Sequence, residues 1–324
     1  MSSILSEPHF HSEEAAFAFV EAWIWPNGPE CPFCGCTKEH IGSLQGVRSK
    51  PSKKNPEGKV TIGLRKCYGC RKQFTVRVGT IFEASHAPLR IWLQAIYLLC
   101  SSKKGISSRQ LQRTLRVGMK TAWFLGHRIR EAMAPASDAG MIGGEGVIVE
   151  SDETELGGSH KTRKTKPRSM NKKFVALVER GGRVRSRDIT GARVSITQEV
   201  REALQANLHP ASTLHTDSAV WYDKRVPAAK HEMVNHSKEY ARTAEDGSRV
   251  YTNSAEGYFS IFKRGLDGTY QHMSSQHLQR YLNEFDFRMN TRTRLGYSDE
   301  TRTHEALKGA KGKRLTYQKS RGQA

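Results

Sequence analysis

Long apolar runs are missing from this sequence. The longest apolar stretch in the 324 residues runs from Ile91 to Cys100 and is interrupted by Gln94, whereas a membrane span needs ~18–20 consecutive apolar residues. The N-terminal sequence MSSILSEPHFHSEE lacks the basic start and apolar middle of a secretory signal. We therefore expect no membrane partner and a cytoplasmic location.

Acidic residues are also scarce relative to basic ones. The chain has 32 Asp and Glu against 52 Lys and Arg, a formal net charge of +20. Excess charge of one sign opposes compaction through self-repulsion and favours a polyanionic partner. Nucleic acid fits this role because each neutralised phosphate releases condensed counterions. We expect a nucleoid-associated protein, although charge alone also allows a basic protein without such a partner.

Cysteine is almost absent outside one short region. Of the six cysteines only Cys100 lies beyond residues 31–70, where Cys31-x-x-Cys34 and Cys67-x-x-Cys70 form two pairs. Thiols stay reduced in the cytosol, so such a cluster indicates metal binding rather than disulfides. Four thiolates at ~2.3 Å complete the tetrahedral shell of a structural zinc ion. The spacing therefore predicts a zinc ribbon.

The remaining residues of this region leave two alternatives to that site. Cys36 is a substitute ligand, but it is closer to Cys34 than a usual knuckle spacing allows. Redox-active thiol pairs are the other alternative, although such motifs usually occur singly. Gly35 and Gly69 suit the sharp turns that direct backbone amides toward sulfur. Cys100 lies in an apolar helical segment, where we expect a core residue.

The first half of the chain has helical patterns on both sides of the cysteines. We expect a helix over residues 12–25, a strand over 73–78 and an apolar helix over 88–100. Residues 105–133 then predict two helices, Ser107 to Leu115 and Met119 to Met133, separated by a turn with Gly118. This is the outline of a helix-turn-helix, although an ordinary helical hairpin with solvated charges has the same pattern. The basic residues that we expect to contact DNA are Arg109, Arg113, Arg116, Lys120 and Arg128.

From Gly143 the pattern changes to an α/β layout. Three strands, a helix, a further strand and then helices predict a mixed sheet covered by helices. The expected strands are 147–152, 174–178, 184–189, 213–217 and 233–234, and the expected helices are 197–208, a helix from about 254, and 274–290.

Acidic residues follow two of the expected buried strands. Asp152 follows Val147-Ile148-Val149, and Asp217 follows Thr213-Leu214. A carboxylate at the end of a buried strand is costly unless it is hydrogen-bonded or binds a cation. Two such groups on neighbouring strands suit a pair of metal ions ~3.5–4 Å apart that promotes phosphodiester chemistry. Glu256 is the candidate third acid, and Lys263 lies two turns further along the same helical face.

Each of these acids also has a simpler interpretation. Asn253 and Glu256 have the spacing of a helix N-cap and its partner in a capping box. Near Asp152, the rival ligands are Glu153 and Glu155, and strand alternation is expected to turn both of them away from the face of Asp152.

Four blocks of the sequence resemble a known family. SDETELGG, TDSAVWY, VNHSKEY and YTNSAEGYFSIFKRGLDGTYQHMSSQHLQRYLNEFDFRMNTR are similar to successive blocks of the bacterial zinc-ribbon DDE insertion-sequence transposases. The similarity runs from about Phe10 to Leu295. It implies an RNase H-like catalytic domain in which Asp152 and Asp217 bind metal, Lys263 contacts DNA and His236 lies near the site.

The third acid and one basic position depart from the family pattern. Members of the family carry either Asn or Glu at the third position, and this chain has both, Asn253 and Glu256. We choose Glu256 because a carboxylate binds a hard cation better than a neutral amide does. The blocks also imply a Lys directly after Gly157-Gly158, where this chain has Ser159-His160 before Lys161.

These features predict an insertion-sequence transposase that binds terminal inverted repeats and target DNA and catalyses metal-dependent cleavage and strand transfer. We expect Zn²⁺ in the ribbon, Mg²⁺ or Mn²⁺ at the acids, and a homodimer or larger assembly on DNA. The alternatives are a zinc-ribbon DNA-binding regulator without catalysis and a nuclease that does not join ends. The expected parts are residues 1–85 (helix and zinc ribbon), 86–140 (helix-turn-helix-like segment), 141–295 (catalytic domain) and 296–324 (basic tail).

Overall fold

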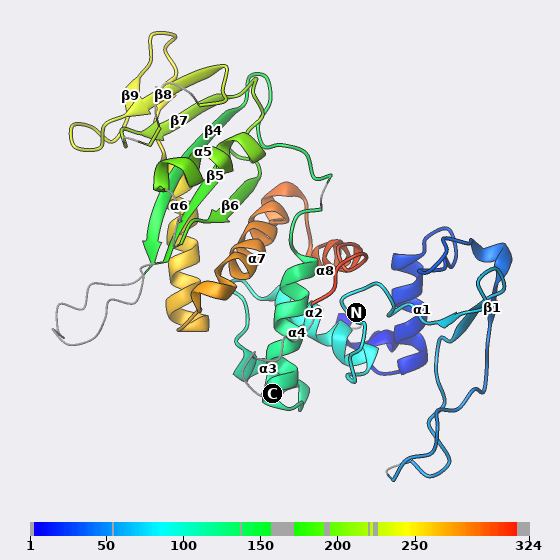
Figure 1. Ribbon diagram of the computed structural model, residues 1–324. Coiled ribbons are helices and arrows are strands. Elements are labelled where there is room, and N and C mark those ends of the chain that lie inside the picture. Colours follow the sequence, from blue (N-terminus) through cyan, green and yellow to red (C-terminus); the bar gives the residue numbers. More distant parts are fainter. Residues whose placement is uncertain are drawn as a thin grey trace. The chain divides into compact units, whose positions relative to one another are not determined.

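The computed structural model describes residues 3–53, 55–136, 138–156, 172–190, 195–219, 221–222 and 226–315. The chain forms two compact units, one from Met1–Met133 with Ser298–Ala324 and the other from Ala134–Tyr297 (Figure 1). Within the described residues, no helix combines the length and the apolar character that a membrane crossing requires.

The first unit contains a small antiparallel sheet, in which the second cysteine pair, Cys67 and Cys70, lies at the turn between two strands. Its strands β1 (Ile41–Ser43), β2 (Arg65–Cys67) and β3 (Gln73–Phe74) pair in the order β1-β2-β3. The predicted strand over residues 73–78 is therefore too long. The amide of Val78 donates to the carbonyl of Thr75 at 3.1 Å, and this turn directs Val76 into the core.

Helices make up the rest of the first unit and confirm the main sequence predictions. The Ser12 hydroxyl caps the first of them by accepting a hydrogen bond from the amide of Ala15, and Cys100 is fully buried, as expected. The helices are α1 (Glu13–Ile24), α2 (Leu89–Ser101), α3 (Ser108–Leu115), α4 (Met119–Ala132) and α8 (Asp299–Lys308).

Helix α8 corrects the prediction of a basic tail from residue 296. Ser298 and Thr301 form a capping box that begins the helix, and such a box satisfies two otherwise free backbone amides. Ala306 and Leu307 are buried, and α8 packs against α1, α2 and α4. The basic composition of the segment concealed an amphipathic helix whose apolar side chains complete the core of the first unit.

The second unit contains a five-stranded mixed sheet in the order β6-β5-β4-β7-β8. Strand β4 pairs antiparallel with β5 and parallel with β7, while β6 extends the antiparallel side and β8 the parallel side. This arrangement confirms the predicted RNase H-like α/β fold. The strands are β4 (Ile148–Leu156), β5 (Lys172–Glu179), β6 (Val184–Asp188), β7 (Thr213–Asp217) and β8 (Lys230–Val234).

Helices cover both faces of this sheet (Figure 1). Val175 and Leu177 of β5 pack with α5 (Ile196–Asn207), whereas Phe174 and Ala176 pack with α6 (Asn253–Gly265) and α7 (Leu278–Asn290). Successive side chains of a strand point to opposite faces, so both faces of a central strand must be apolar. That requirement explains the continuous apolar run from Phe174 in the sequence.

Short elements complete the described structure. Val234, Ala244 and Val250 form a small apolar cluster beside the hairpin of β9 (Arg242–Thr243) and β10 (Arg249–Val250). The short helical turns are Ile4–Ser6, Pro8–Phe10, Lys38–His40, Leu266–Tyr270, Ser275–His277 and Thr293–Leu295.

Candidate functional site

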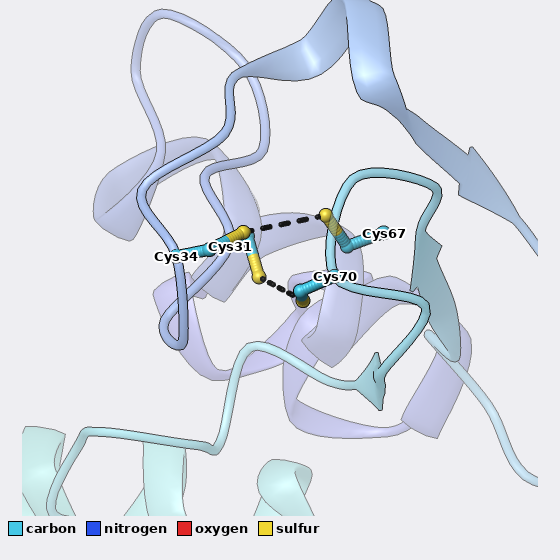
Figure 2. Close-up of side chains that lie close together, drawn as sticks. All are labelled: Cys31, Cys34, Cys67 and Cys70. Atoms are coloured by element: carbon cyan, nitrogen blue, oxygen red, sulfur yellow. Dashed lines mark hydrogen bonds between the residues drawn. The ribbon is translucent and has the colours of Figure 1, made fainter.

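The predicted cysteine ligands of the first unit converge on one point. Two loops bring the Sγ atoms of Cys31, Cys34, Cys67 and Cys70 within 4.8 Å of one another (Figure 2). The Sγ atoms of Cys31 and Cys70 are 3.6 Å apart, as are those of Cys34 and Cys67. A tetrahedral zinc ion with Zn–S bonds of ~2.3 Å requires sulfur–sulfur distances of about 3.8 Å. The four thiols therefore fit a structural zinc ion.

The backbone around these cysteines supports metal binding. Hydrogen bonding from the amide of Cys70, and then from the thiol of Cys34, lowers the pKa of Cys67 to about 6. Burial and the neighbouring thiols outweigh backbone hydrogen bonds at Cys34 and Cys70 and raise the pKa of each to about 11, so one thiolate forms readily and the full set of thiolates that a metal binds requires the cation itself. A Cβ atom on Gly69 would lie 2.8 Å from the Sγ of Cys36, so a larger residue there requires the Cys36 side chain to move. Cys36 itself lies outside the four-sulfur group.

In the second unit, two predicted acids lie side by side on adjacent strands. Asp217 ends β7, as expected, but Asp152 lies within β4, which continues to Leu156, so the expectation that Asp152 ends its strand is wrong. The parallel pairing of β4 with β7 aligns Ser151 with Thr216, so the next residues, Asp152 and Asp217, emerge together on the same face. Carboxylate oxygens of both residues belong to a group within 4.8 Å of one another. The strand register thus confirms the expected closeness of these two acids.

Glu153 is the third member of this carboxylate group, so the prediction that strand alternation turns it away from Asp152 is wrong for its carboxylate. Strand alternation does place Glu153 on the opposite face of β4, where it accepts a hydrogen bond at 3.0 Å from the hydroxyl of Tyr222. Strand β7, however, ends at Asp217 and leaves that side of β4 open beyond Ser151. The Glu153 side chain is long enough to bring its carboxylate back toward Asp152 at this edge. Alternation predicts the direction of Cβ, not the position of a flexible carboxylate.

Crowding of negative charge perturbs the site strongly. Burial, followed by the charges of Glu153, Asp217 and Glu256, raises the pKa of Asp152 from 3.8 to about 8. Burial also raises the pKa of Glu153. Several carboxylates that oppose one another's ionisation need a cation to neutralise them, and carboxylate oxygens are the ligands that Mg²⁺ and Mn²⁺ prefer. The residues present therefore fit a divalent cation.

The two candidates for the third acid occupy different surroundings on α6. Glu256 is exposed, and its charge contributes to the raised pKa of Asp152. Asn253 instead lines a hollow of about 510 Å³ together with Ala241, Arg249, Tyr251 and Ser254. A charge effect on Asp152 can come only from Glu256, so it does not separate the two candidates, and Glu256 lies outside the carboxylates that the structure places within 4.8 Å of one another.

Comparison with known proteins agrees with these two centres. The transposase zinc-ribbon domain model matches residues 11–73, and the ISXO2-like transposase domain model matches residues 142–290. The chain belongs to the zinc-ribbon insertion-sequence transposases. A protein of the transposable element ISH50 from Halobacterium salinarum is 25% identical to this transposase over 297 residues, which cover 86% of the chain and 91% of the relative.

The helix-turn-helix outline of the transposase is present in the first unit. Helix α3 ends at Leu115, its C-cap residue Arg116 adopts the left-handed conformation with φ of 51°, and Gly118 precedes α4. The side chains of Arg109, Arg113, Arg116 and Lys120 are exposed.

Arg128 corrects the predicted set of DNA-contacting residues. Its side chain is only 3% exposed, and it donates to the carbonyl oxygens of Ile81 at 2.7 Å, Glu83 at 2.6 Å and Leu315 at 3.1 Å. The inner face of α4 is buried, so an arginine there must use its donors inside the protein. Arg128 therefore stabilises the first unit and does not face solvent.

The remaining predicted residues of the transposase lie around α6 or outside the described chain. Lys263 is exposed on α6. The Nε2 atom of His236 is 3.0 Å from the hydroxyl of Thr252, the residue that precedes α6. The segment in which the sequence departs from the family pattern of a Lys after two glycines, Ser159 to Lys161, lies outside the described residues.

Proposed function

We propose that this transposase binds the terminal inverted repeats of its element and catalyses metal-dependent DNA cleavage and strand transfer. The main support is the position of Asp152 and Asp217 on neighbouring parallel strands, where β7 ends at Asp217 and the two carboxylates converge. A structural ion pair does not explain this group, because Asp152 is surrounded by other acids that raise its pKa. Perturbed carboxylates of this kind indicate a functional site.

In this proposal, Asp152, Asp217 and Glu256 hold two Mg²⁺ or Mn²⁺ ions. When bound, such ions activate the attacking oxygen and stabilise the leaving oxygen of a phosphodiester. Glu153 supplies a further carboxylate oxygen beside Asp152 and Asp217, and the hydroxyl of Tyr222 orients it.

The basic residues of α6 and of the first unit serve DNA binding. Lys263 lies two turns beyond Glu256 on one side of α6, where an ammonium group is suited to a substrate phosphate. The zinc ribbon and the exposed α3–α4 face contact the inverted repeats. The α3–α4 residues assigned to DNA are Arg109, Arg113, Arg116 and Lys120.

The reaction has two phosphoryl-transfer steps. In the first, water attacks the phosphodiester at the end of the element and releases a 3′-hydroxyl. In the second, that hydroxyl attacks a phosphodiester of the target, forms the new bond and displaces the target's own 3′ oxygen. Since two ends must be joined to one target, we also propose that a homodimer or larger assembly acts on DNA.

The deciding experiment uses the full chain with labelled inverted-repeat ends, target DNA and Mg²⁺. We expect joined products from the wild type and none from Asp217→Ala, while both proteins retard the repeat ends equally in a gel-shift assay. Asp267→Asn, a change at an exposed acid outside the site, is the matched control and should join normally.

Other outcomes would identify the alternatives. End binding without cleavage, unaffected by Asp217→Ala, would indicate a DNA-binding regulator. Cleavage without joined products would indicate a nuclease of the same fold. Joining by Asp217→Ala at the wild-type rate would refute the assignment of Asp217.

A further inference from the structure

A second acid of β4 has no place in the metal group. Glu150 lies two residues before Asp152 and therefore on the same face of the strand. Its side chain is completely buried. A buried carboxylate is costly unless it is fully hydrogen-bonded and paired, so its partners indicate what it does.

Glu150 binds the first turn of α6. Its Oε2 atom accepts hydrogen bonds from the backbone amides of Ser254 at 2.6 Å and Ala255 at 3.3 Å, and Oε1 accepts one from the Ser254 hydroxyl at 3.0 Å. Helix N-termini offer free amides and a positive dipole end to a carboxylate. Glu150 thus holds the start of α6 against β4, and the next residue of the helix is Glu256.

Arg180, the residue that follows β5, completes this attachment. Its Nε donates to Glu150 Oε1 at 2.7 Å, and its other nitrogens donate to the carbonyl oxygens of Arg249 at 2.9 Å and Tyr251 at 3.2 Å. The guanidinium also stacks on the Tyr251 ring, 3.6 Å from the centroid, and lies 3.0 Å from His215 Nδ1. One planar group therefore binds the sheet and the segment that leads into α6.

We propose that Glu150 and Arg180 are positioning residues that hold Glu256 in reach of Asp152 and thereby set the affinity of the site for divalent metal. This inference rests on the proposed metal-dependent function. Asp152 and Glu150 face the same side of one strand, so the same backbone fixes the first acid and the anchor of the third. The separation of the acids then depends on the Glu150 contacts and not on the packing of the exposed Glu256 side chain.

The chain offers a matched control in Glu179. Its carboxylate accepts amide hydrogen bonds from Gly143 and Arg183, both at 2.8 Å, and pairs with Arg183 at 3.0 Å. It thus has the same kinds of partner as Glu150, in the same sheet, but none of them belongs to α6. Replacing Glu179 by Gln removes a carboxylate charge from the same sheet but leaves the contacts of α6 intact. This variant therefore shows whether a general loss of stability in the second unit is enough to weaken metal binding.

The experiment measures Mn²⁺ binding to the purified full chain from the electron paramagnetic resonance signal of free Mn²⁺. We expect Glu150→Gln to weaken Mn²⁺ binding about 10-fold, the range typical of residues that orient metal ligands. Glu179→Gln should stay within about twofold of the wild type. High Mn²⁺ should restore DNA cleavage by Glu150→Gln but not by Asp152→Asn.

Arg180→Lys provides a second test that retains the positive charge. Lysine at this position loses the hydrogen bonds to the carbonyls before α6, so this variant should also weaken Mn²⁺ binding. It still tests the inference if Glu150→Gln fails to fold. Wild-type affinity in Arg180→Lys, or in a folded Glu150→Gln, would overturn the inference, and so would equal weakening by Glu179→Gln. Failure of the wild type to bind Mn²⁺ would instead refute the proposed function.

Discussion

Replacing Asp152 by Asn should stabilise the metal-free transposase. The wild-type carboxyl group has its pKa raised from 3.8 to about 8 by burial and by the charges of Glu153, Asp217 and Glu256. The folded state therefore retains a proton that the unfolded state has released between about pH 4 and 8. Stability contributed by this group falls as the pH rises through that interval, and an amide, which has no charge, avoids the loss.

The size of the effect follows from the pKa. One pKa unit corresponds to ~1.4 kcal/mol, so a rise from 3.8 to about 8 sets a ceiling of about 6 kcal/mol at pH 8. The carboxyl group is partly exposed, and solvent screening reduces the expected gain to about 2 kcal/mol. For a unit of this size, that gain raises the melting temperature by roughly 4–8 °C.

Differential scanning calorimetry of the full chain at pH 8 in EDTA measures this gain on the transition of the second unit. Asp267→Asn, at an exposed acid, should stay within about 0.5 kcal/mol of the wild type. The advantage of Asp152→Asn should vanish near pH 4 and reverse in saturating Mn²⁺, which stabilises only a protein that binds it. An Asp152→Asn variant no more stable than the wild type at pH 8 in EDTA would refute the electrostatic argument.

Further predictions concern the zinc ribbon, the DNA-binding helices and the third acid. Cys70→Ser should lose bound zinc and lower the stability of the first unit by several kcal/mol, as metal analysis and calorimetry would show; unchanged zinc content would contradict the Cys₄ assignment. Arg113→Ala should reduce the slope of log affinity against log salt for the repeat ends by about 1, with stability unchanged. Arg128→Ala should instead cost about 3 kcal/mol because buried carbonyls lose their donors; a normal melting temperature would place Arg128 at the surface. Glu256→Ala should abolish strand transfer while Asn253→Ala retains it, and the opposite result would make Asn253 the third ligand.

Local sequence signals were sufficient for much of the fold. Cysteine spacing identified the four sulfur ligands because each C-x-x-C pair lies in one tight turn and needs only a second pair to complete a tetrahedron. The helix cap Ser12 also predicted helix α1, and the apolar run from Phe174 predicted strand β5. In each case the determining interaction lies within a few residues of chain or follows from the strand period.

Long-range packing decided what these signals could not. Arg128 has the charge of a DNA-contacting residue, but the buried face of α4 turns it toward the carbonyls of Ile81, Glu83 and Leu315. Helix α8 looked like a tail by composition, and only its packing on α1, α2 and α4 gives its apolar side chains a partner. Charge and composition do not reveal which side chains are buried by other elements of the fold.

The sequence by itself determined that Asp152 and Asp217 follow the apolar residues of two buried strands in a transposase with a zinc ribbon. Only the tertiary structure decided which other groups share their surroundings. The early end of β7 lets Glu153 join them, and Glu150 binds the turn of α6 that carries Glu256. Both depend on how strands and a helix far apart in the chain are aligned, and strand periodicity contains no information about that alignment.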